Sequence, residues 1–104
     1  LLTHGADANA AAGHHGGTVL HRAVINGNAD AVALLLAHYA SPDRQDWSGK
    51  TPLHHAVSRN RKLTELIVAR KPDLAIESKQ SETARQLAVR LGKTAVIKAL
   101  DVNA

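Results

Sequence analysis

Apolar residues recur along the chain in short stripes with helical spacing, separated by polar turns. Leu53, Ala56 and Val57 occupy positions i, i+3 and i+4, a spacing that places side chains on one face of an α-helix. Thr51 stands at the N-cap position, and Pro52 follows at the first helical position, where its missing N–H costs no hydrogen bond. The stripe stops after Val57, so the pattern predicts a helix of about two turns.

A second stripe follows after a short polar break. It consists of these residues: Leu63, Leu66, Ile67 and either Ala69 or Arg70. The helix ends before Pro72, because proline disfavours helical angles in the residue that precedes it. The middle of the chain therefore predicts a pair of short helices.

The sequence predicts a similar pair of short helices on each side of this one. The expected helices cover residues 19–26, 30–38, 83–91 and 94–100, with turns at Gly27 and Gly92. Helices of about eight or nine residues are marginal in isolation. Each pair must therefore bury its apolar stripes against its neighbours.

The pairs belong to an internal repeat. The stretch Thr18–Val24 recurs as Thr51–Val57, and an eroded third copy follows as Thr83–Val89. Self-similarity at a period of about 33 residues predicts a stacked repeat array. The third copy lacks both the proline and the histidine of the motif and is rich in basic residues, which predicts a degenerate, solubilising cap.

The repeat resembles the ankyrin repeat family. The best-matching motifs are Thr51–Ala56, which reads Thr-Pro-Leu-His-His-Ala, Gly49 before it, and the triple leucine Leu34–Leu36. The resemblance implies an all-α solenoid, an ankyrin-type stack of antiparallel helix pairs with hairpin-like loops projecting from it. It also implies one domain over 1–104, divided into a half repeat 1–9 and repeats at about 10–42, 43–74 and 75–104.

Composition narrows the class of protein further. The 104 residues include no Cys, no Met and no Phe, which excludes disulfides, thiolate zinc sites and cysteine catalysis. A chain without Met indicates a fragment, so we expect more repeats or another domain in the parent protein. No apolar run approaches the ~18–20 residues that a membrane span requires, and we expect an intracellular location, in the cytoplasm or nucleus.

The net charge of +4 is placed unevenly. Residues 1–52 carry three basic and four acidic side chains, whereas residues 53–104 carry ten and five. This excess either forms a solvated surface or steers a partner protein with an acidic surface. Nucleic acid is disfavoured, because no aromatic platform or reading helix accompanies the charge.

The histidines have a structural interpretation. The resemblance implies that His21 bonds the Thr18 hydroxyl and a loop backbone group, and that His54 does the same with Thr51. His14 and His15 lie in a glycine-rich loop with no Cys or carboxylate nearby, so no metal site is predicted there. The chain has no Gly-x-Ser-x-Gly elbow, Walker loop or dinucleotide fingerprint, so we expect neither a cofactor nor an enzyme.

With catalytic and metal sites not predicted, the sequence points to a binding surface. In ankyrin-like stacks a concave groove is lined by loop tips and by exposed positions of each first helix. The matching loop residues are His14, His15, Trp47, Ser48, Lys50 and Lys79. The matching helix residues are Ile25, Asn26, Ser58, Arg59 and Arg90. Trp47 either packs against its own loop or anchors an interface, with Lys50 and Arg59 beside it.

The resemblance therefore predicts a non-catalytic scaffold for protein–protein interaction. Two alternatives stay open at this stage. The array could recruit substrates for an enzyme whose catalytic domain lies elsewhere in the parent chain. It could also resemble inhibitor-of-κB arrays that bind a transcription factor, because residues 9–17 form a long loop and the last unit contains Gln86–Ala88.

Overall fold

Six short helices make up the regular structure of the described residues. The computed structural model describes residues 17–38 and 40–102, and these contain no β-strand. The helices are α1 (Val19–Ile25), α2 (Ala29–Ala37), α3 (Pro52–Arg59), α4 (Arg61–Val68), α5 (Ala84–Arg90) and α6 (Thr94–Val102). The all-α fold predicted from the sequence is confirmed.

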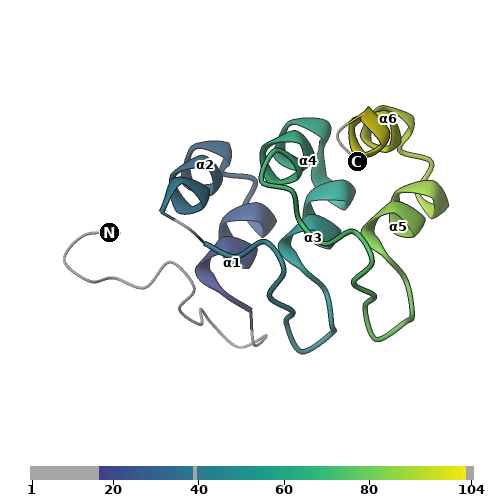
Figure 1. Cartoon of the computed structure of the whole chain (residues 1–104), viewed down its shortest axis with the longest axis horizontal. Coiled ribbons are helices and arrows are strands. Elements are labelled where there is room, and N and C mark those ends of the chain that lie inside the picture. The colour runs from purple at the N-terminus through teal and green to yellow at the C-terminus, as the bar shows by residue number, and fades with distance from the viewer. Residues whose placement is uncertain (1–16, 39, 103–104) are drawn as a thin grey trace.

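The helices stand in two parallel rows (Figure 1). One row contains α1, α3 and α5, and the other contains α2, α4 and α6. Each helix packs against its pair partner and against its neighbour along the row. The loops that precede α3 and α5 project from the side of the first row. The described helices thus form a stack of pairs in which each unit packs against the next.

The turns between paired helices differ in length. Gly27 and Gly92 occupy positive φ angles of 71° and 69°, which glycine adopts without a steric penalty. Between α3 and α4 a single residue, Asn60, is the C-cap of one helix and the N-cap of the next. Its Oδ1 accepts a hydrogen bond from the backbone N–H of Leu63 at 2.9 Å, so the amide side chain satisfies the start of α4.

The core runs along the seam between the two rows. Its largest fully buried side chains include Leu20, Leu53, Leu63, Ile67 and Leu100. The predicted stripe of α4 was wrong at its end. Ala69 and Arg70 are exposed, and Thr64 and Val68 are buried instead. The reason is that α4 packs between α2 and α6 and is therefore covered on both flanks.

The third unit leaves exposed a motif position that is buried in the first two units. The third motif position is Leu20 and Leu53 in the first two copies, and both are buried. In the third copy it is Arg85, whose Nε donates to Oδ1 of Asp101 in α6 at 2.9 Å. This face is still partly apolar, because Val89 is 52% exposed. The ion pair gives the unit a more polar outer side than its neighbours have.

Candidate functional site

The threonine at each repeat start caps the first helix and fixes the side chain three residues later. The Thr18 side chain accepts from the backbone N–H of His21 at 3.4 Å, while the Thr18 N–H donates to Nδ1 of that ring at 3.0 Å. Thr51 and His54 make the same pair of contacts at 3.3 and 3.1 Å. In the third unit Gln86 replaces the histidine, and its Oε1 accepts from the Thr83 N–H at 2.9 Å.

His21 and His54 also hold the loop of the following unit in place. Nε2 of His21 lies 2.9 Å from the backbone oxygen of Lys50, and Nε2 of His54 lies 2.8 Å from that of Glu82. Because Nδ1 accepts from a backbone N–H, the ring proton must reside on Nε2, which donates to the carbonyl. The two histidines therefore fix the positions of the loops and are not free to bind a metal.

The burial of the His21 and His54 rings makes folding sensitive to mild acid. Burial is the main cause that lowers the pKa of both His21 and His54 below the usual 6.5. A group whose pKa is lower in the folded state binds more protons when the chain is unfolded. Its contribution to the free energy of unfolding is therefore complete above pH 6.5 and is lost as the pH falls through the folded pKa. We expect the free energy of unfolding, measured with urea, to fall between pH 7.5 and pH 5.5.

A variant of His54 separates this effect from other titrations. His54→Gln installs the residue that the third unit carries as Gln86, which accepts the threonine N–H without titrating. This variant should be less stable at pH 7.5, because the bond to the Glu82 carbonyl is lost, and its stability should change less with pH. An unchanged pH dependence would contradict the assigned role of His54.

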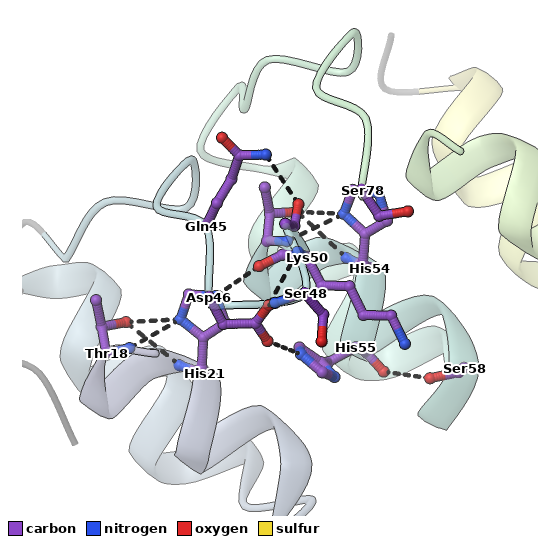
Figure 2. A network of polar contacts seen from close by, with 12 residues as sticks. Thr18, His21, Gln45, Asp46, Ser48, Lys50, His54, His55, Ser58 and Ser78 are labelled. Atoms are coloured by element: carbon purple, nitrogen blue, oxygen red, sulfur yellow. Dashed lines mark hydrogen bonds and ion pairs between the residues drawn. The ribbon is translucent and has the colours of Figure 1, made fainter. Parts of the chain in front are cut away.

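The loop before α3, residues 44–50, which we call the middle loop, is wrapped around the carboxylate of Asp46 (Figure 2). Oδ1 accepts from the backbone N–H groups of Ser48 and Lys50 at 2.9 and 3.0 Å, and Oδ2 lies 2.9 Å from Nε2 of His55. Burial alone would raise the pKa of Asp46, but the hydrogen bonds from His55, Lys50 and Ser48 outweigh it and hold the pKa below its usual value. The ionised carboxylate thereby ties the loop to α3.

The role of His55 was not predicted from the sequence. Its ring also meets that of His21 edge to face, with the centroids 5.8 Å apart. A signal was present in Asp46, which stands three residues before Gly49, since aspartate commonly bonds the backbone of its own turn.

The middle loop is joined to the next loop as well. The Lys79 N–H donates to the Ser48 carbonyl at 2.9 Å, and the amide of Gln45 donates to the carbonyls of Gly49 and Glu77 at 2.9 and 3.1 Å. The two loops therefore form one connected platform, with Trp47 at its surface. The Trp47 side chain is 68% exposed.

The predicted surface residues fall into two groups. Trp47, Ser48, Lys50 and Lys79 lie on the joined loops, and we call the surface formed by residues 44–50 and 77–82 the loop platform. Arg90 belongs to this group, because its guanidinium reaches back to Glu82, with Nε 2.8 Å from Oε2.

The second group lies at the far ends of the first helices. Its members are these four: Ile25, Asn26, Ser58 and Arg59. The Arg59 guanidinium covers the turn after α1, because a Cβ added to Gly27 would come within 2.6 Å of Nη2. The length of α3 therefore separates Arg59 from Trp47. His14 and His15 lie outside the described residues.

Among residues 17–38 and 40–102, no group of three His, Asp or Glu side chains could hold a metal ion. In that same part of the chain, no helix has the length and apolar character needed to cross a bilayer.

Comparison with known proteins identifies the class. The family profile described as ankyrin repeats in three copies matches residues 1–78, three quarters of the chain. The chain belongs to the ankyrin repeat family, whose repeats generally mediate protein–protein interaction. The helix pair α5 and α6 continues the stack beyond the matched range.

The individual relatives are much longer proteins. Over 52 residues, half of this chain, it is 52% identical to the 2-5A-dependent ribonuclease of Mus musculus and 44% identical to potassium channel AKT3 of Oryza sativa subsp. japonica. Over the same length it is 46% identical to potassium channel AKT1 of Oryza sativa subsp. indica. The chain covers only 6–7% of the length of these proteins, so the likeness concerns a short part of each.

Proposed function

We propose that this chain is a non-catalytic scaffold that binds another protein through the loop platform and the exposed ends of the first helices. The observation that carries the proposal is Trp47, 68% exposed on a loop whose backbone is held by Asp46 and by the neighbouring loop. A large aromatic side chain on a fixed backbone loses little conformational entropy when it enters a partner's pocket. Tryptophan is also enriched among residues that dominate binding energy.

The exposure of Trp47 bears on its two interpretations. A ring packed flat against its own loop would hide much of its surface, and a side chain that is 68% exposed does not. The anchor interpretation is therefore the better supported of the two. Lys50 stands three residues further along the same loop and would add charge at the rim of the contact.

The partner that fits this surface has an acidic face. The basic excess lies in the second half of the chain. Of the three carboxylates on the platform, Asp46 and Glu82 are bonded to His55 and Arg90, whereas Glu77 is exposed. Lys79 is exposed on the same platform, and its ammonium forms no ion pair with a carboxylate of the described residues, so it can meet an incoming carboxylate. Complementary charge of this kind mainly raises the association rate and makes it dependent on salt.

Trp47→Ala should weaken binding to a partner by at least tenfold, because a buried tryptophan anchor can contribute about 2 kcal/mol or more. Partners would be recovered with the immobilised chain and their affinities measured by calorimetry. Leu34→Ala is the matched control, since Leu34 is an apolar side chain on α2 that is 50% exposed. Equal affinities for wild type and Trp47→Ala, with helix content preserved, would reject the platform as the binding site.

The array could serve a larger protein with an activity of its own. The likeness to a ribonuclease and to potassium channels, of which the chain covers 6–7%, favours such an accessory role. The full-length parent sequence would distinguish a substrate-recruiting array from a free-standing scaffold. The inhibitor-of-κB alternative depends on the loop at residues 9–17, of which the structure describes only Gly17, and on Gln86–Ala88 of the last unit. An intracellular location stays a prediction.

A further inference from the structure

A hollow opens between the middle loop and α5, at one edge of the loop platform. It is lined by Lys50, Gln80, Glu82 and Arg90, and its volume is about 440 Å³. The hollow is open to solvent, and its lining is mostly polar. Two cations and one carboxylate face it, which leaves a single net positive charge.

The carboxylate of the hollow is already engaged. Nε and Nη2 of Arg90 bond the two oxygens of Glu82 at 2.8 and 3.1 Å. This hydrogen bond with Arg90 is the main cause that lowers the pKa of Glu82, so Glu82 stays ionised and paired. A guanidinium has five N–H donors, and Arg90 therefore keeps donors that Glu82 does not occupy.

The other two lining residues also present donors. The backbone of Lys50 is committed, since its N–H donates to Asp46 and its carbonyl accepts from His21. Its ammonium forms no ion pair with a carboxylate of the described residues. Oε1 of Gln80 accepts from the Ser78 hydroxyl at 3.2 Å, which leaves the NH₂ end of the amide to donate. The hollow thus offers more donors than acceptors.

We propose that this hollow receives an aspartate or glutamate side chain of the partner protein. The inference rests on the proposed function and specifies what the partner carries. A carboxylate needs several donors and one positive charge, and Lys50, Gln80 and Arg90 supply them. Trp47 stands on the same loop as Lys50, so the occupant is an acidic segment with an apolar residue near the acid.

The charge of the hollow favours a carboxylate over a phosphate. A carboxylate carries one negative charge, which balances the single net positive charge of the lining. A phosphate carries up to two, so the carboxylate of Glu82 would repel it up to about twice as strongly as it repels a carboxylate. A nucleic-acid backbone would place a row of such charges against the same surface.

The test uses the 104-residue chain and a defined probe. The probe is a blocked pentapeptide, Gly-Glu-Leu-Glu-Gly, and its control has glutamine in place of both glutamates. Titration into the isotope-labelled chain, followed by amide chemical shifts, should perturb Lys50, Gln80 and Arg90 with the acidic peptide and leave them unmoved with the control. Lys50→Gln should lower the affinity of the chain for the acidic peptide about tenfold, the usual effect of losing one charge-assisted contact.

A charge-matched variant gives the comparison. Lys98→Gln removes the same charge from an exposed position of α6 and should leave the affinity unchanged. The proposal is overturned if Lys50→Gln and Lys98→Gln lower the affinity for the acidic peptide equally, or if the glutamine peptide binds with the same affinity as the acidic one. It is also overturned if oligothymidylate or inorganic phosphate binds the hollow more tightly than the acidic peptide does. If a protein partner loses affinity with Trp47→Ala but binds Lys50→Gln as tightly as wild type, the hollow is not the carboxylate site, and the proposed function still stands.

Discussion

Leu53→Ala is expected to lower the free energy of unfolding by about 2–5 kcal/mol, the range for truncating a buried leucine to alanine. Leu53 is only 2% exposed. It belongs to α3, which packs against α1, α4 and α5, so a cavity here weakens the packing of the first helix of the middle unit against its neighbours. Domains are stable by about 5–15 kcal/mol, and this loss is a large part of that total.

The measurement is urea denaturation followed by far-UV circular dichroism. Lys79→Ala is the control, since Lys79 is an exposed loop residue and such substitutions usually change stability by under about 0.5 kcal/mol. The midpoint should shift for Leu53→Ala without a comparable change in slope. Similar midpoints for the two variants would mean that the inward-facing assignment of α3 is wrong.

The helices could be predicted because their signals are local. The threonine cap, the proline after it and the i, i+3, i+4 stripe all act within about two turns of α3. The repeat then predicts the stacking, since similar stripes at a period of about 33 residues have only each other to pack against. The six observed helices follow the expected ranges to within a few residues.

The burial of α4 and the joining of the loops could not be predicted in the same way. Thr64 is buried because α4 has neighbours on both flanks, and its hydroxyl donates to the Asn60 carbonyl at 3.0 Å. The bond from Gln45 to Glu77 joins residues 32 positions apart. No local pattern encodes such contacts, because they depend on how far the loops project once the helices have stacked.

In the candidate site, too, the residues could be predicted one by one, but their arrangement could not. Trp47 could be selected as an aromatic residue within a polar turn, but its exposed fraction depends on the surrounding loops. The hollow lined by Lys50 and Arg90 combines side chains that lie far apart in the sequence. Sequence reasoning identified each residue separately, and only the stacked fold brings the two into one hollow.

Gly49→Ala is expected to destabilise the chain and to separate the two loops. Gly49 has a φ of 74°, a left-handed conformation that costs a residue with a Cβ about 1–3 kcal/mol. An added Cβ would also lie 2.7 Å from the backbone nitrogen of Lys79 and 3.1 Å from the carbonyl carbon of Ser78. These are backbone atoms, so they can move away only if the hydrogen bond from Lys79 to Ser48 is strained or broken.

Gly92→Ala separates the two causes. Gly92 has a similar φ of 69°, but nothing lies within 4 Å of a Cβ added there, so this variant carries the conformational cost alone. Urea denaturation should show a larger loss for Gly49→Ala than for Gly92→Ala, and amide hydrogen exchange at Lys79 should accelerate only in the former. Equal losses with unchanged exchange would contradict the close joining of the loops. Because Trp47 and Lys50 stand on the loop that this contact holds, Gly49→Ala should weaken partner binding as well, whereas Gly92→Ala should not.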